Sequence, residues 1–229
     1  MKKVTNGVLA VCALGLLFIC IRSIRDTQNF DAQVAARESV VKARLIEIRS
    51  AQEAFKVRNN GVYCDNWNQL IEFVKNDSLP SVKKQGVLSD EQMDRGLTES
   101  KAAAIVNSGD LAAIKEYGLE NFRRDTVWVS VMDSLFTYNG FNADSLRYIP
   151  FAEGDTFEII AVPTTTRSGT ILQVMECNAP DTSFLKGMGK EGKRLIYNRN
   201  EDAEAKGAYP GLKIGEASPN WNNNAGNWE

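Results

Sequence analysis

The feature that most constrains this chain is its N-terminal segment, residues 4–57, where a long apolar run passes directly into a charged pattern. No proline or glycine lies between Ile21 and Asn60, so nothing there interrupts a helix. Residues 4–21 are uncharged, and these 18 residues, if helical, span about 27 Å, close to the ~30 Å hydrocarbon core of a bilayer. We therefore predict one long helix whose first third crosses a membrane.

Other interpretations of the apolar run remain open. A cleaved signal peptide would explain its basic start, but no small-x-small cleavage pattern follows Ile21, and the first one, in Ala32–Ala36, comes too late. A lipoprotein signal lacks the small residue expected before Cys20, and a buried helix of a soluble domain is the last alternative. The sequence favours an uncleaved anchor in residues 1–22, with the rest of the chain in a bacterial periplasm, outside the inner membrane.

The next segment, residues 23–60, is predicted to be an amphipathic stem helix. Its apolar residues follow the spacing of heptad positions a and d: Val34, Val41, Leu45, Ile48 and Phe55. Such a face can associate with another helix or pack on the protein's own domain. Because Val40, Ile46 and Val57 widen the apolar face, packing on the domain is favoured and helix association is the alternative.

Two motifs mark the end of the stem. Residues Arg44–Tyr63 finish in Asn-Gly-Val-Tyr, and Trp67-Asn-Gln-Leu70 follows. Across Val4–Val74 the chain resembles type IV pilins and type II secretion pseudopilins, which implies a membrane-embedded helix, a stem and assembly into an apparatus. Those families carry Gly and then Glu at the fifth mature position. Here Gly7 is present, but Cys12 stands where the Glu is expected.

Short helices are predicted after the stem. Asn59–Gly61 is a helix stop, and Asn66 caps a short helix over 67–74 within the turn region 61–80. Residues 81–125 are polar and predict a helical insertion. Its three helix starts are signalled by Ser89, Thr98 and Asp110. The insertion is either peripheral decoration or a binding surface.

The pattern changes to period two in residues 126–198, which predicts an antiparallel sheet of four or five strands. The candidate strands are Val127–Met132, Leu135–Tyr138, Leu146–Ile149, Thr156–Val162 and Thr170–Cys177. Pro163 is expected to end one strand, and Lys193–Tyr197 is either a further strand or a short helix. The expected fold class is therefore α+β.

The tail, residues 199–229, is rich in Asn, Gly and Ala. Its segments Tyr209–Gly215 and Asn223–Glu229 are similar to envelope proteins of Bacteroidota, a resemblance that implies no activity. Trp221 and Trp228 each carry enough apolar area to favour a tail docked on the sheet. A tail that recognises a partner is the alternative.

Composition excludes several classes of function. The chain has no histidine, which removes Ser-His-Asp and Cys-His nucleophile systems and the zinc sites that need histidine. The net charge is −2, and beyond Arg22 there are 24 basic and 29 acidic side chains. An acidic domain disfavours nucleic acid as a partner, because phosphate binding needs a basic face.

Few residues offer chemistry. The acid clusters at 90–94 and 201–204 lack the spacing of a calcium loop, and Gly187–Gly192 lacks the spacing and Ser/Thr of a phosphate-binding loop. Cys64 and Cys177 could form a disulfide between stem and sheet, which would constrain the unfolded chain by about 4–5 kcal/mol. Two buried free thiols are the equal alternative.

The sequence thus predicts a non-enzymatic protein, with no catalytic, cofactor-binding or metal-binding residue, anchored in the lipid bilayer through residues 4–21. We expect a structural or assembly subunit with a protein partner or self-association. The alternative is an anchored module that binds a ligand or a peptide.

Overall fold

The chain divides into two compact units, Met1–Ile71 with Asn142–Glu229, and Glu72–Phe141. The computed structural model describes residues 2–166, 168–219 and 221–229, with side chains only from Leu14 onward. The fold is α+β, with a long N-terminal helix and antiparallel sheets, and this part of the prediction is confirmed.

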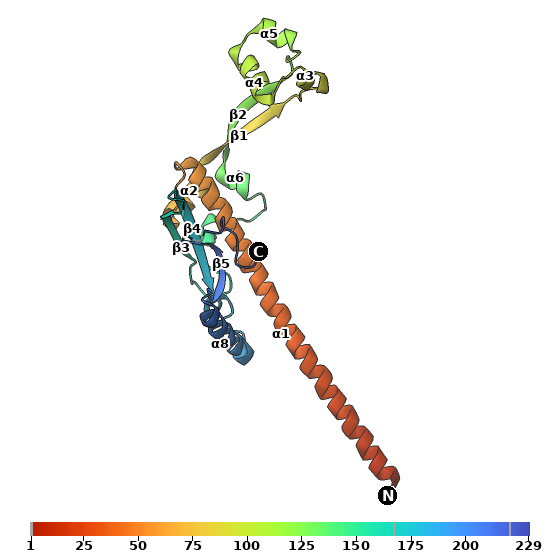
Figure 1. Ribbon diagram of the computed structural model, residues 1–229. Coiled ribbons are helices and arrows are strands. Elements are labelled where there is room, and N and C mark those ends of the chain that lie inside the picture. The colour runs from red at the N-terminus through yellow and green to blue at the C-terminus, as the bar shows by residue number, and fades with distance from the viewer. Residues whose placement is uncertain (1, 167, 220) are drawn as a thin grey trace. The chain divides into compact units, whose positions relative to one another are not determined.

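Helix α1 (Lys2–Arg58) is continuous from the N-terminal end into the first unit (Figure 1). It ends where the backbone turns left-handed, with φ of 55° at Asn60 and 83° at Gly61. The backbone N–H of Gly61 donates to the carbonyl oxygen of Lys56 at 2.9 Å, which satisfies one of the last helix carbonyls. The Asn-Asn-Gly signal therefore ends the helix by the expected local geometry.

Helix α2 (Trp67–Asn76) follows a short extended segment. The side-chain oxygen of Asn66 accepts from the backbone N–H groups of Asn68 at 2.9 Å and Gln69 at 3.2 Å, which is the predicted N-cap. The indole N–H of Trp67 donates to the carbonyl oxygen of Phe157 at 2.9 Å. The first turn of α2 is thereby attached to the chain just before the sheet of the first unit.

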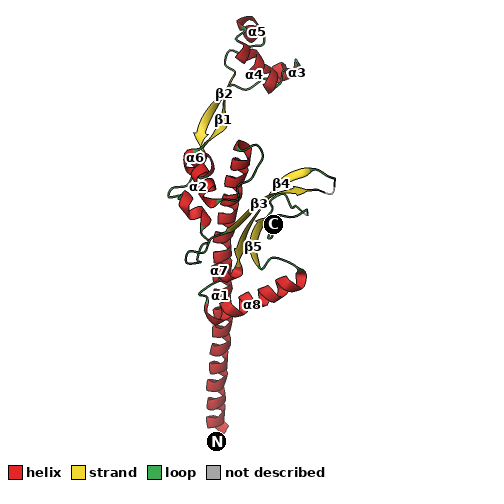
Figure 2. Cartoon of the chain, turned by 90° about the vertical axis from the view of Figure 1, so that its left-hand side faces the viewer, coloured by secondary structure: helices red, strands yellow, loops and turns green. Residues whose placement is uncertain are grey.

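The first unit contains a three-stranded antiparallel sheet in the order β3 (Glu158–Thr165), β4 (Ile171–Pro180), β5 (Gly211–Gly215) (Figure 2). The register places Cys177 opposite Ile159 on one side and Ile214 on the other. Strand β3 continues past Pro163, since an edge strand tolerates the missing N–H. Strand β5 is formed by the C-terminal tail.

Helix α1 packs against β5, α7 (Asp181–Phe184) and the 3-10 helix η1 (Ala143–Arg147), all in the first unit. Large side chains with almost no exposed surface fill this core: Leu45, Ile48, Phe157, Met175, Phe184 and Ile214. Helix α8 (Gly189–Lys206) lies between β4 and β5 in the chain. The outer half of α1 is thus a structural element of its own domain.

The second unit is built on a two-stranded antiparallel ribbon of β1 (Ser78–Gln85) and β2 (Arg123–Ser130). Gln85 pairs with Arg123, and the chain between them forms α3 (Asp90–Asp94), α4 (Glu99–Ser108) and α5 (Leu111–Glu116). Helix α6 (Val131–Leu135) follows β2.

The three helices between β1 and β2 have a small core of their own. Its buried members are Leu88, Leu97, Ala102, Leu119 and Phe122. Each helix begins at the predicted cap, and Ser89 makes a capping box with Gln92. We call residues 86–122 the tip module.

A sheet of four or five strands is not confirmed. Of the predicted strand Val127–Met132, residues 127–130 belong to β2 and pair with β1, in a different sheet from β3 and β4, whereas Val131 and Met132 begin helix α6. Strand β1 carries Pro80 and is exposed along most of its length, so it lacks the apolar alternation that marks a half-buried strand.

One further predicted strand is replaced by a helical turn, and one alternative that the sequence left open is decided. Leu146 lies in η1, where the side chain of Asn142 accepts from the N–H of Asp144 and favours a helical turn over a strand. Lys193–Tyr197 belongs to the 18-residue helix α8, which selects the helical alternative.

Candidate functional site

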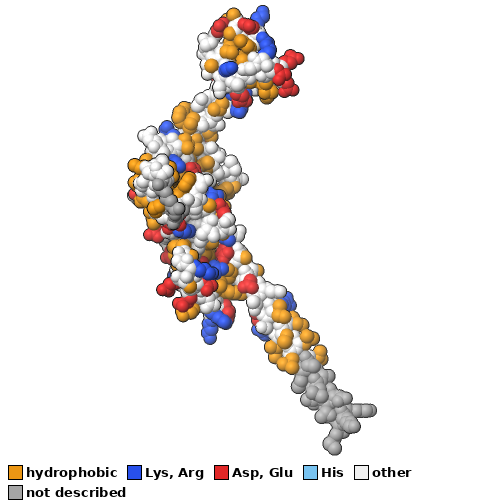
Figure 3. Space-filling model, viewed as in Figure 1, with side chains coloured by type: hydrophobic (Ala, Val, Ile, Leu, Met, Phe, Trp, Pro, Cys, Tyr) orange, Lys and Arg blue, Asp and Glu red, His pale blue; other side chains and the backbone are white. Residues whose placement is uncertain are grey.

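In the N-terminal half of α1, the side chains that the structure describes form a continuous exposed apolar surface. Every large apolar side chain from residue 14 to 24 is between 48% and 66% exposed. These side chains are Leu14, Leu16, Leu17, Phe18, Ile19, Ile21 and Ile24. Figure 3 shows the resulting band of hydrophobic side chains along the helix.

This surface surrounds the helix. Leu16, Leu17, Phe18 and Ile19 are consecutive, and a turn of about 100° per residue directs them to all sides. A helix that is apolar all round is typical of burial in lipid or within a larger helical assembly. Exposed apolar patches of this kind mark interaction surfaces.

A polar segment separates the exposed half from the half held by the domain. Arg22 and Asp26 form an exposed ion pair at 3.7 Å, and the hydroxyl of Thr27 donates to the carbonyl oxygen of Ser23 at 3.1 Å. Val34 is the first described buried residue of α1. The helix therefore changes environment within about three turns.

Among the residues that the structure describes, no helix has a stretch that is both long and apolar enough to cross a membrane. Most of the span predicted from the sequence, residues 4–21, lies outside the described side chains, which begin at Leu14.

The predicted association face of the stem is occupied. Val34, Val41, Leu45, Ile48 and Phe55 are all buried, at 7% exposure or less. Because α1 packs on β5, α7 and η1, these side chains form the core of the first unit. In the structure this seam packs on the protein's own domain and is not exposed for association with a helix of another chain. Val40, Ile46 and Val57, which widened the predicted face, do not share this packing, since they are 46%, 41% and 73% exposed.

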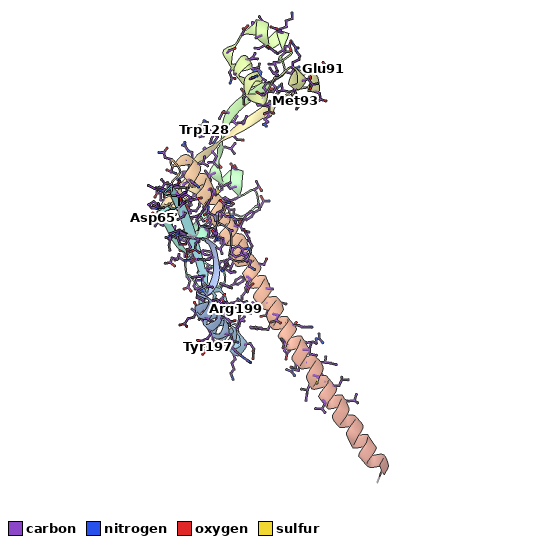
Figure 4. All side chains as sticks on the ribbon, viewed as in Figure 1. Asp65, Glu91, Met93, Trp128, Tyr197 and Arg199 are labelled. Atoms are coloured by element: carbon purple, nitrogen blue, oxygen red, sulfur yellow. The ribbon has the colours of Figure 1, made fainter. Side chains whose placement is uncertain are left out.

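A cluster of charged side chains links helices α1, α7 and α8 near the N-terminal end of the buried part of α1. Arg199 of α8, labelled in Figure 4, contacts Glu38 of α1 at 2.7 Å and Asp181 of α7 at 3.3 Å. Burial raises the pKa of the Asp181 carboxyl above its ordinary value of 3.8, against the attraction of Arg199. Beside it, Arg37 donates to the carbonyl oxygens of Phe184 at 2.9 Å and of residue 186 at 2.8 Å.

A second polar network fixes the tail to the upper stem. The Tyr63 hydroxyl donates to Glu53 at 2.6 Å and accepts from Lys56 at 2.9 Å. The amide of Asn224 donates to both Glu53 and Tyr63, at 2.6 Å and 2.7 Å. Burial, and then the hydrogen bond to Glu53, raise the pKa of Tyr63. The network therefore has a structural role, since it joins the tail to the stem, and the Tyr63 phenol in it is neutral.

The two candidate disulfide cysteines are free thiols in the structure. Cys64 and Cys177 are both buried, and burial raises the pKa of each thiol. Cys64 is held at the end of the stem, where its backbone N–H donates to the Gln52 side chain at 2.9 Å and its thiol donates to Asn66. Cys177 lies within β4, between its two neighbouring strands. The structure thus contains two buried free thiols and not the Cys64–Cys177 disulfide.

A hollow of about 440 Å³ lies in the second unit, between the tip module and the start of β2. Apolar Leu111 and Ile114 line one part of it, and Arg123, Arg124 and Asp125 line another. Leu111 is itself exposed, as are Val87 and Met93 elsewhere in the module.

Acidic residues do not assemble into a metal site within the described part of the chain. Asp90, Glu91 and Asp94 lie on the short helix α3, with Glu91 pointing away from the module in Figure 4. Glu201, Asp202 and Glu204 lie on α8, where their side chains are exposed. Both clusters have the character of solvated helix faces.

The chain matches no protein-family model, no curated protein and no solved structure.

Sequence reasoning missed the two polar networks because their members are far apart in the chain. Arg199 and Glu38 are 161 residues apart, and so are Asn224 and Tyr63. Asn224 is one of several asparagines in the tail, and no local pattern distinguishes it. Gln52, which bonds the backbone of Cys64, differs from these residues, because a polar side chain in an otherwise apolar slot of the stem is a local signal.

Proposed function

We propose that this protein is a non-enzymatic, single-pass membrane protein of a bacterial envelope, with its domain in the periplasm, and that it acts as a structural or assembly subunit. The apparatus it serves would be of the pilin-like or secretion type. The observation that carries the proposal is the exposed apolar surface over residues 14–24 of a helix whose other half is the core of a folded unit.

The size of that surface supports a lipid or helix-packed environment. Seven large side chains at about 1.5–3 kcal/mol each correspond to roughly 10–20 kcal/mol for complete removal from water. The ion pair of Arg22 and Asp26 at the end of the apolar stretch suits the polar edge of a bilayer.

The stem supports a role in presentation. Arg199 joins α1 to α7 and α8, and Asn224 joins the tail to Glu53 and Tyr63, so the first unit is attached to the stem at two levels. A helix held in this way sets the distance between a membrane and the first unit. Contacts with other subunits would then be made through the exposed half of α1, because the apolar seam of the other half is packed on its own domain.

Photo-crosslinking in native membranes tests the assembly role. A benzophenone amino acid replaces Phe18 in the full chain, and the control carries it at Val57, also exposed on α1. We expect adducts with a second protein, or a second copy, from position 18 and none from position 57. Lipid adducts alone at position 18 would contradict an assembly role while leaving the anchor intact.

The second candidate function is an anchored module that binds a ligand or a peptide. It is favoured by the tip module, whose hollow of about 440 Å³ lies beside the exposed Leu111. The same photo-reactive residue at position 111 tests this function. A specific adduct from position 111, with none from position 18, would select the binding module over the assembly subunit.

A further inference from the structure

Helix α8 has an exposed basic face. Lys190, Lys193, Arg194 and Tyr197 are exposed and follow i, i+3, i+4, i+7 spacing, which places them on one side of the helix. The only acid among residues 190–197 is Glu191. Figure 3 shows Lys and Arg side chains gathered at the end of the first unit where α8 lies.

The start of α8 lies beside the exposed half of α1. A groove of about 470 Å³ joins them. Its lining consists of Phe18, Ile19, Arg22, Ser23, Asp26, Thr27 and Phe30 from α1, with Glu191 from α8. The first turn of α8 therefore stands at the level of residues 18–30 of α1, and in Figures 1 and 2 α8 is the part of the first unit beside the emerging helix.

This level coincides with the headgroup layer of the proposed membrane. If the hydrocarbon region ends near Arg22, the adjoining polar layer of about 5–7 Å covers roughly the next three to five residues of the helix. Those residues extend to about Asp26, and both Arg22 and Asp26 line the groove shared with α8.

We propose that the face formed by Lys190, Lys193, Arg194 and Tyr197 binds the anionic phospholipid headgroups of the membrane that holds α1. This inference rests on the proposed anchor. Lysine and arginine next to a membrane are attracted by anionic lipids, and tyrosine is favoured at the interface because its ring is apolar and its hydroxyl polar.

The charge along α8 limits the contact to its first half. Beyond the basic face the helix carries Glu201, Asp202 and Glu204, which anionic headgroups would repel. The first half of α8 would thus form a second attachment to the membrane. Together with α1 it would fix the rotation of the first unit about the helix axis, which a single anchor leaves free.

Photo-crosslinking in vesicles tests the inference with the full chain. A benzophenone amino acid replaces Tyr197, and a control variant carries it at Glu204, seven residues along the same helix. Each variant is reconstituted into vesicles of phosphatidylcholine alone or mixed with phosphatidylglycerol, and lipid adducts are measured by mass spectrometry. Flotation of the vesicles reports separately whether the chain is anchored.

We expect lipid adducts at position 197 to be at least about fivefold more abundant with phosphatidylglycerol, and to be lost in the triple variant Lys190→Glu, Lys193→Glu, Arg194→Glu. Position 204 should give few adducts in either lipid. If the chain floats with the vesicles but position 197 gives no lipid adducts, or equal adducts in both lipids, the headgroup contact is rejected. The proposed anchor is then unaffected. Chains that fail to float would overturn the anchor, and this inference with it.

Discussion

Arg199 is the residue on which the lower attachment of the stem depends. It is the described partner of Asp181, whose side chain is only 3% exposed, and it also reaches Glu38. Removing one member of a buried ion pair is costly because it leaves the other charge desolvated and uncompensated.

We expect Arg199→Ala to lower the free energy of unfolding by about 1–3 kcal/mol, less than for a fully buried pair because the Arg199 side chain is 35% exposed. The measurement is urea denaturation followed by circular dichroism. Arg194→Ala, on the exposed face of the same helix, should change it by no more than about 0.5 kcal/mol. The double variant Arg199→Ala with Asp181→Asn should recover part of the loss. Equal effects of the two single substitutions would show that the buried cluster is not stabilising.

The two buried cysteines give a second test at the residue scale. In a Cys12→Ser, Cys20→Ser background, only Cys64 and Cys177 remain. Because burial raises the pKa of both thiols and shields them, alkylation should be slow in the folded chain. Under denaturing conditions without reductant, mass spectrometry should find both thiols alkylated. Alkylation of neither would establish the disulfide instead.

At the scale of the element, α1 has two halves with different surroundings. Ile48 is completely buried in the first unit, whereas Ile46, two residues away, is 41% exposed. This contrast makes Ile46 a matched control for the packing of the stem.

Ile48→Ala should lower the free energy of unfolding by about 2–5 kcal/mol, because a buried side chain is lost and a cavity remains. Ile46→Ala should cost less than about 1 kcal/mol. The measurement is urea denaturation at two protein concentrations. If Ile48 packed against a second copy of the chain, its effect would depend on concentration, which would contradict the observed packing.

The elements that could be predicted are those specified by nearby residues. Asn59–Gly61 ends α1, Asn66 caps α2, and Ser89, Thr98 and Asp110 begin the three helices of the tip module, all through contacts within a few residues. Strand β1 could not be predicted, because the ladder partner that the described residues give it is β2, about forty residues later in the chain. The same holds for β5, whose place beside β4 depends on long-range packing.

For helix α1, the local sequence pattern identified the exposed apolar half but not the segments against which the other half packs. The seam of Val41, Leu45 and Ile48 predicted a buried face and favoured packing on the domain, without indicating which segments of the domain it contacts. Packing on β5, α7 and η1 decides it, and that partner is assembled from three separate segments of the chain. Arg199 and Asn224 could not be singled out for the same reason.

At the scale of the whole molecule, the tip module can be removed from the chain because its two ends lie side by side. Gln85 and Arg123 are register partners at the ends of β1 and β2, so a two-residue Asn-Gly turn can replace residues 86–122. The shortened chain should keep the thermal unfolding transition of the first unit and lose only the helical signal of the module. Loss of the transition would show that the module is needed for folding.

The central claim is that the exposed half of α1 lies in a membrane while the other half supports the domain. The double variant Leu14→Arg, Leu17→Arg places two charges in the apolar surface, at a cost of about 2.5–3.5 kcal/mol each near the centre of a spanning helix. Its control, Val40→Arg, Val57→Arg, places two charges on exposed positions farther along α1.

Extraction of membranes with alkaline carbonate is the most direct measurement. The unaltered chain and the control should remain in the membrane pellet, and the Leu14→Arg, Leu17→Arg variant should be released to the supernatant. Release of the unaltered chain, or retention of all three proteins to the same extent, would contradict the account.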